Sequence, residues 1–320
     1  MKNKKLLLSC SVCLLLVLAA LPLMSACAKA PQTAGPPVST KGYSIFDETM
    51  ADMAWPAIDD AAKKGAIILF PTGVIEEHGP HQAAGLDTYE GYIWSKHMKH
   101  ELEAKGIQTL MAPPFYWGTG TMSAFPGSFE IKPENMKAVL SDAFSCLKKW
   151  GFNNVFVCNW HGGNEATLLS FVKDIRGSLG INAYFVIPEV RAAPLKLTGK
   201  EEYVLIVPAA PQTGPPEKYV DFHAGKGETG YMAAFFPDLV NKQLAKTLKS
   251  TDLTGRDAGA LLSDPAVFRQ KLPQGYIGDP ASFDAKDYKA DMEDSGKRAA
   301  NTIEALLKGT YKPPEIKPGW

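Results

Sequence analysis

Two histidines and three carboxylates lie within a dozen residues of this chain, directly after a short apolar run. Residues 76–81 read Glu-Glu-His-Gly-Pro-His, Asp87 follows them, and the apolar run 66–71 precedes them. Glu76 and His78, two residues apart in an extended segment, point to the same side of the chain, and the turn after them can return Asp87 beside them. A pair of divalent ions needs such a bridging carboxylate, with nitrogen and oxygen ligands on either side. The segment therefore predicts metal-assisted chemistry, against the alternative of solvated acids and a loop histidine.

A second segment has a similar composition. Residues 159–164 read Asn-Trp-His-Gly-Gly-Asn and follow a strand-like run, so His161 is a natural further ligand at the end of that strand. The two glycines let backbone come close to an ion or a ligand. Asn164 is also placed to cap the helix that is predicted to follow, a role compatible with metal binding by His161.

The third segment, residues 221–229, offers His223 and Glu228. Glu228 opens a helical pattern, where it can complete the coordination of a second metal or serve as a first-turn acid favoured by the helix dipole. We expect His223 to be a general acid or base with Asp221 orienting it; a histidine bonded to backbone is the structural alternative. His81 is expected to support the ligands from outside rather than to bind metal itself.

The remaining histidines and cysteines are expected to have structural roles. His97 and His100 lie among lysines on a predicted helix and are expected at the surface. Cys146 and Cys158 give no disulfide framework and are expected to be small buried hydrophobic residues.

Short apolar runs alternate with helical patterns along the chain, which predicts βαβ units and a mostly parallel sheet in an α/β sandwich. Each candidate motif directly follows a strand or opens a helix, and open α/β sheets gather ligands at that edge. Residues 188–220 and the region around the turn cluster 275–280 are expected to be irregular. The expected strands are 66–71, 109–112, 155–158 and 183–187, and the expected helices are 89–105, 133–150, 165–179, 228–236 and 285–308.

The first 30 residues have the features of an export signal. Three lysines precede the apolar run 6–23, and small residues follow it. The stretch Met-Ser-Ala-Cys that ends at Cys27 resembles a bacterial lipobox, so Cys27 is the expected lipidation site. A membrane span and ordinary cleavage near residue 28 or 30, releasing a soluble exported protein, are the alternatives.

These features predict a cell-envelope lipoprotein of a bacterium, held to the membrane by its lipid. Loss of the signal leaves 31 basic against 34 acidic residues, a balance that excludes a basic nucleic-acid binder. The expected organisation is a signal peptide at 1–26, a tether rich in Pro, Gly and Thr at 27–43, one catalytic domain at 44–310 and a tail at 311–320.

The motifs together resemble those of the creatininase family of amidohydrolases. That family shows Glu-x-His-Gly-Pro-His and then an aspartate nine residues after the first histidine, as this chain does from Glu76 to Asp87. The resemblance spans about residues 50–308 and continues through 125–128 (Phe-Pro-Gly-Ser, where the family usually has Thr last), 159–164, 223–229 and 278–280.

The resemblance implies a single-domain, Rossmann-like three-layer sandwich that holds two divalent ions, either zinc, manganese or iron. In that pattern Glu76 and His161 hold one metal, His78 holds the other, and Asp87 bridges them. The family's members are often hexamers, so a homo-oligomer is expected. Their substrates are small molecules with C–N bonds in cyclic amides, formamides or small peptides.

One position departs from creatininase itself. Creatininase has a metal-binding glutamate two residues after the histidine that corresponds to His161, and Gly163 stands there in this chain. Either the second metal site is looser or, as we expect from the shared His-Ala-Gly-x-x-Glu-Thr pattern, Glu228 holds that metal. The departure also argues against creatinine as the substrate.

The expected reaction is hydrolysis by metal-activated water, with His223 protonating the departing nitrogen. Trp117, Tyr116 and Trp160 are candidate walls of the substrate pocket, or core aromatic residues. An exported lipoprotein that binds a metal or a small ligand without turnover is the alternative of a different class. A metal phosphoesterase would need a cationic clamp, and Lys226 is the only cation within the motifs.

Overall fold

The computed structural model describes residues 42–211 and 219–316 of the chain, and the described residues from Tyr43 onward form one compact unit. The predicted signal peptide at 1–26, the lipidation site Cys27 and nearly all of the predicted tether lie outside the described residues. Among the described residues, no helix is both long and apolar enough to span a membrane.

Within the described residues, five parallel strands form the central sheet, in the order β2-β1-β3-β4-β5. The two central strands, β1 and β3, pair in register from Ile68 opposite Val155 to Thr72 opposite Asn159. This order confirms the predicted parallel sheet and is that of a doubly wound fold, with its switch point between β1 and β3. The strands are β1 (Ile67–Thr72), β2 (Thr109–Met111), β3 (Asn154–Asn159), β4 (Asn182–Pro188) and β5 (Val204–Val207).

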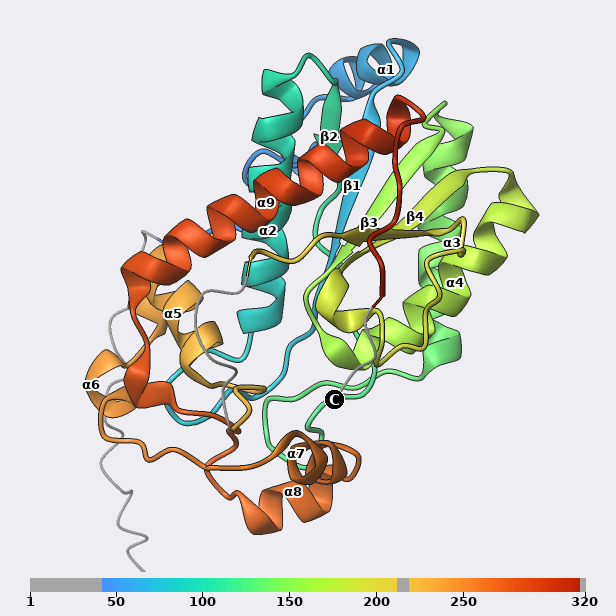
Figure 1. Ribbon diagram of the computed structural model, residues 1–320. Coiled ribbons are helices and arrows are strands. Elements are labelled where there is room, and N and C mark those ends of the chain that lie inside the picture. The colour runs from blue at the N-terminus through green and yellow to red at the C-terminus, as the bar shows by residue number, and fades with distance from the viewer. Residues whose placement is uncertain (1–41, 212–218, 317–320) are drawn as a thin grey trace, which may run out of the picture. The chain divides into compact units, whose positions relative to one another are not determined.

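Helices cover both faces of the sheet, so the strands are apolar on both sides. Alternate residues of β1 enter opposite cores: Ile68 packs with one set of helices and Leu69 with the other. One face carries α1 (Trp55–Lys63), α3 (Pro133–Lys149) and α4 (Glu165–Leu179). The other face carries α2 (Leu86–Ala104), α9 (Ala285–Leu307) and α5 (Lys226–Phe235). In Figure 1, α9 crosses α2, against which it packs. The three-layer sandwich is confirmed.

The five predicted helices begin and end within three residues of the observed ones, but the predicted irregular regions contain further elements. The Val-Leu-Ile-Val run of β5 adds the edge strand within residues 188–220. Short capped helices fill the region before α9, which was expected to be irregular: Thr254 and Asp264 accept backbone N–H bonds at the starts of α7 and α8. The remaining short elements of the described residues are α6 (Lys242–Ala245), α7 (Gly255–Leu262), α8 (Pro265–Lys271) and the 3-10 turns η1 (Met50–Asp52), η2 (Gly162–Asn164), η3 (Glu189–Arg191), η4 (Pro237–Leu239) and η5 (Pro280–Ser282).

Two expectations about burial are wrong. Cys146 is exposed, because Phe144 and Leu147 supply the buried face of α3 at that turn, whereas Cys158 is buried as expected. His97 is partly buried rather than at the surface, since its Cβ lies where Gly296 of α9 leaves room and its ring packs edge-on against Phe235.

Candidate metal centre

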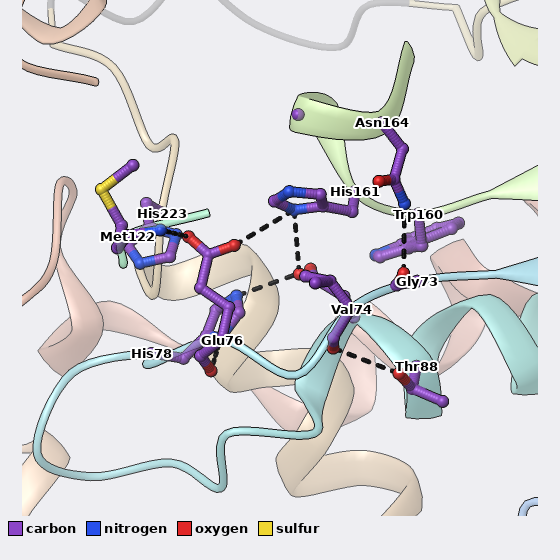
Figure 2. A network of polar contacts seen from close by, with 12 residues as sticks. Gly73, Val74, Glu76, His78, Thr88, Met122, Trp160, His161, Asn164 and His223 are labelled. Atoms are coloured by element: carbon purple, nitrogen blue, oxygen red, sulfur yellow. Dashed lines mark hydrogen bonds and ion pairs between the residues drawn. The ribbon is translucent and has the colours of Figure 1, made fainter. Parts of the chain in front are cut away.

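The predicted ligands meet at the carboxyl ends of β1 and β3, at the switch point of the sheet. The loop after β1 carries Glu76 and His78, and the start of α2 carries Asp87. His161 follows β3 and reaches the same place from the neighbouring strand. Figure 2 shows His161 turned toward Glu76 in this cluster.

The first donor group consists of Glu76, Asp87 and His161, all buried. Nδ1 of His161 lies 3.3 Å from Oε2 of Glu76 and 3.0 Å from Oδ2 of Asp87. One nitrogen and two carboxylate oxygens therefore converge on a volume the size of one cation.

The second donor group consists of His78, His223 and Glu228. Nε2 of His78 lies 3.8 Å from Oε2 of Glu228 and 3.5 Å from Oδ1 of Asp87. Asp87 thus directs one oxygen to each group, which is the arrangement that a bridging ligand needs. Glu228 is held in turn by the backbone N–H of Ala224, 2.5 Å from Oε2.

Backbone carbonyls orient the two imidazoles that face Asp87. Nδ1 of His78 lies 3.0 Å from the carbonyl oxygen of Glu76, and Nε2 of His161 lies 3.1 Å from that of Thr119. A carbonyl can only accept, so each contact places the proton of a neutral imidazole on the nitrogen that faces away from the cluster. The other nitrogen of each ring then offers its lone pair to a metal.

The buried carboxylates of the cluster create a negative potential that favours a bound positive charge. Burial lowers the pKa of His161, but the carboxylates of Glu76 and Asp87 outweigh burial and raise this pKa to about 9. The pKa of His78 is likewise held well above its ordinary value despite burial, chiefly by Asp87 and Glu228. Oε2 of Glu76 and Oδ2 of Asp87 are buried without a hydrogen-bond partner among the described residues. These residues fit a divalent cation, which would satisfy both the carboxylate charge and the two oxygens.

A scaffold of polar contacts fixes the cluster. The backbone N–H of Met122 donates to Oε1 of Glu76 at 3.0 Å, which leaves Oε2 directed at His161. Asn164 donates to the carbonyl of Gly73 at 3.1 Å (Figure 2). It also accepts from the N–H of Thr119 at 2.9 Å. Asn164 therefore ties together the loops after β1 and β3, rather than capping α4 with its side chain.

Gly163 is required by this packing. A Cβ at that position would lie 2.4 Å from the Thr119 carbonyl oxygen and 2.5 Å from Nε2 of His161. The glutamate of creatininase therefore has no room here, and Glu228 supplies a carboxylate from the other side of the cluster.

His81 lies outside both donor groups. Its Nε2 lies 2.8 Å from the hydroxyl of Thr229, the residue after Glu228, while its buried Nδ1 has no partner among the described residues. Burial, aided by the nearby His78, lowers the pKa of His81 to about 4, so the ring is neutral at physiological pH. This placement suits the supporting role expected for His81.

The three aromatic residues predicted to line a substrate pocket lie in different surroundings. Trp117 is 40% exposed and packs edge-on against Phe129, whereas Tyr116 lines a separate apolar cavity near the start of α2. The indole of Trp160 packs against Trp94 and Tyr231. The pocket role of these three residues stays a prediction.

Sequence reasoning missed two acidic residues near the centre. Glu90 is fully buried and accepts a short hydrogen bond from the indole N–H of Trp160; burial, reinforced by Glu228 and Asp87, raises the pKa of Glu90 well above its usual value. Oε1 of Glu77 lies 3.2 Å from Nε2 of His223.

The orienting role expected of Asp221 is contradicted. Its oxygens accept from the backbone N–H groups of Lys226 at 2.7 Å and Gly227 at 2.8 Å, at the start of α5. Glu77 makes the contact with His223 instead. No local signal identifies Glu77, because its partner lies 146 residues away in the chain.

A parallel α/β sandwich with a cluster of histidines and carboxylates at its switch point defines the class of metal-dependent α/β hydrolases. A family model described as creatinine amidohydrolase matches residues 51–303. The chain belongs to this creatininase family.

Curated relatives are similar over parts of the chain. Creatinine amidohydrolase of Pseudomonas putida is 21% identical over 62% of this chain and 74% of its own. The 3-dehydro-scyllo-inosose hydrolase of Thermotoga maritima is 24% identical over 80% of this chain and 78% of its own. The mycofactocin precursor peptide peptidase of Mycobacterium ulcerans is 31% identical, but the match spans 34% of this chain and only 45% of the peptidase.

Solved structures agree on the fold. A structure described as "Creatininase Mn" superimposes with a TM-score of 0.59 at 17% identity, covering 81% of this chain and 98% of the other. A putative creatinine amidohydrolase from Bacteroides fragilis has a TM-score of 0.57 at 19% identity, over 82% and 97% of the two chains. These similarities confirm the creatininase-like fold.

Proposed function

We propose that the chain is a hydrolase that uses two divalent cations to cleave a C–N bond of a small cyclic amide, a formamide or a related substrate. The observation that carries the proposal is the placement of Asp87, with one carboxylate oxygen toward each of two donor groups. A site for a single ion would need metal ligands near only one of the two Asp87 oxygens, whereas here each oxygen faces its own group of ligands.

The chain's own residues divide the work. Glu76 and His161 would hold one cation, His78 and Glu228 the other, and Asp87 would bridge them. Bound divalent cations would supply acidified water and a Lewis acid for the scissile carbonyl; zinc, manganese and iron suit this mixture of imidazole and carboxylate.

His223 supplies proton transfer in this proposal. Its ring centroid lies 4.5 Å from that of His78, and the ring is nearly buried beside the centre. A nitrogen so placed can hand a proton to the amine that leaves when the C–N bond breaks. His223 also belongs to the second donor group, so the alternative role of a metal ligand is tested along with this one.

The names of the relatives bear on the substrate. One is a creatinine amidohydrolase, one a precursor peptide peptidase and one a hydrolase of 3-dehydro-scyllo-inosose, and a mutant creatininase was solved with creatine. Two of these names denote cleavage of amide-type C–N bonds. We infer that small amides are the substrates to test first.

The test joins metal content to turnover. The purified protein should contain close to two divalent ions per chain and hydrolyse at least one member of a panel of lactams, cyclic ureides, formamides and dipeptides. His78→Ala and Asp87→Ala should lose metal and turnover together, because each removes a buried donor of the centre. His100→Ala is the matched control: it removes an exposed histidine of α2 that pairs with Glu48.

The outcomes separate the alternatives. Either variant keeping both its full metal content and its activity would contradict the assignment. Tight metal binding without hydrolysis of any panel member would instead support a binding protein. Turnover of phosphate esters alone would support a phosphoesterase.

We also propose that the protein is exported and anchored to the cell envelope through a lipid on Cys27. The basic start, apolar run and lipobox-like stretch of residues 1–27 support this proposal. The expected homo-oligomer, a hexamer by family resemblance, remains a prediction for solution measurement.

A further inference from the structure

The Glu77 side chain reaches the ring nitrogen Nε2 of His223 rather than solvent. It is only 10% exposed, the imidazole it meets is 9% exposed, and the two are separated by 3.2 Å between Oε1 and Nε2. Because side chains alternate along an extended segment, Glu77 points away from the side shared by Glu76 and His78. That alternation takes it past the ligands and toward the loop that carries His223.

Several contacts clamp the Glu77 carboxylate and backbone. Oε2 accepts the backbone N–H of Gly79 at 3.0 Å, and the N–H of Glu77 itself donates to the hydroxyl of Ser128 at 2.9 Å. Gly275, with a φ of +69°, makes room for the carboxylate, since a Cβ there would lie 2.1 Å from Oε2. A larger residue at 275 would displace the carboxylate and would also be strained at this φ.

The same segment holds the backbone of His223. The N–H of Ile277 donates to the His223 carbonyl at 2.7 Å, and the N–H of His223 donates to the Ile277 carbonyl at 3.1 Å. Gly275 and Ile277 therefore fix both partners of the Glu77–His223 pair in one frame. Such double support is typical of a contact that must keep its geometry.

We infer that Glu77 is a positioning residue for His223, an inference that rests on the proposed proton-transfer role of that histidine. An ionised carboxylate can only accept, so its contact places the proton of a neutral His223 ring on Nε2. Nδ1, which has no hydrogen bond to any described residue, is then the nitrogen that carries the lone pair. Glu77 thus selects which nitrogen of His223 exchanges protons during the reaction, as an orienting carboxylate does for a catalytic imidazole.

The test compares Glu77→Ala with Glu77→Gln in the metal-loaded protein. Alanine removes the acceptor, so kcat on the best amide of the panel should fall at least about 10-fold while KM and metal content stay unchanged. Nitrogen NMR of labelled histidine should show His223 passing from one tautomer, with the proton on Nε2, to a mixture of both. Glutamine keeps one acceptor oxygen where the carboxylate has two, one for His223 and one for the Gly79 N–H, so it should restore part of both properties.

Glu48→Gln is the matched control, because Glu48 contacts His100 in the same way at the surface, with 2.6 Å between Oε2 and Nε2. It should change neither the kcat nor the His223 signal. A Glu77→Ala protein with the wild-type tautomer and kcat would overturn the inference, as would one that loses metal in proportion to its activity.

The experiment separates this inference from the proposed function. If the wild-type protein hydrolyses no amide, the proposed function fails, yet the tautomer of His223 still reports whether Glu77 sets it. If alanine does not fold, the glutamine variant and the nitrogen spectrum of the wild-type ring still decide: a proton found on Nδ1 overturns the inference.

Discussion

Asp87 shows how much of this centre depends on single side chains. Its two oxygens serve different imidazoles, and both imidazoles have their other nitrogen on a backbone carbonyl. The sequence was sufficient to predict Glu76, His78, Asp87 and His161 as neighbours, because each follows a strand that ends at the same edge. It was not sufficient for Glu77, whose partner arrives from a loop with no local signal of its destination.

Gly163 gives a prediction at the scale of one Cβ. Gly163→Ala would place that atom against the Thr119 and Gly120 carbonyl oxygens and Nε2 of His161, all within 2.5 Å. The loop must shift, so we expect a loss of about 1–3 kcal/mol in the free energy of unfolding and a lower metal content. Denaturant unfolding and elemental analysis measure the two effects.

Gly177 provides the control for that substitution. It lies in α4 with nothing within 4 Å of an added Cβ, so Gly177→Ala should raise stability by up to about 1 kcal/mol. If Gly163→Ala keeps its stability and metal content, the loop can accommodate a Cβ at this position, and the predicted steric clash is wrong.

At the scale of elements, the periodicity of apolar residues predicted the long helices and central strands, because their buried faces span enough residues to show a clear pattern. It missed β5, whose four residues lie in a proline-rich stretch, and α7 and α8, whose short lengths leave little periodicity. Their caps at Thr254 and Asp264 were the available signals. The site does not depend on recognising them, since its ligands come from the loops after β1 and β3, from α2 and α5, and from the loop before α5.

One ion pair joins two elements beside the centre. Arg191 of η3 donates through Nε and Nη2 to both oxygens of Glu165, at 2.8 and 2.5 Å, at the start of α4. Arg191→Met would leave the buried Glu165 carboxylate without its partner. We expect a loss of about 1.5–3 kcal/mol in the free energy of unfolding, measured by denaturant titration.

The companion measurements isolate the pair. Arg191→Met combined with Glu165→Gln should recover part of the loss, because no unpaired charge then remains. The exposed pair of Lys63 and Asp59 should contribute little to the free energy of unfolding when Lys63 is replaced by Met, because solvent screens it. Equal losses at both pairs would contradict a special role for the Arg191 contact.

For the whole molecule, strand order explains why the separate motifs could be assigned to one site from sequence. All strands are parallel, so the loops after β1 and β3 leave the sheet on the same side, and the switch point between these strands opens a place for ligands. What could not be predicted is the direction of individual side chains within the loops, because many of the contacts that fix them join residues between 42 and 148 positions apart.

Anchoring is the prediction that belongs to the whole chain. If Cys27 carries the lipid, labelled palmitate should enter the wild-type protein and not Cys27→Ala, and the variant should move from the membrane fraction to the soluble one. Metal content should not change, since the centre is built entirely from residues 76 to 228 and its supports within the described residues. Wild-type protein without label, cleaved near residue 28 or 30, would instead establish a soluble exported protein. If Cys27→Ala instead stays in the membrane with its first 26 residues intact, the apolar run is an uncleaved membrane span. The proposed hydrolase would then be anchored by a transmembrane segment of its own chain rather than by a lipid.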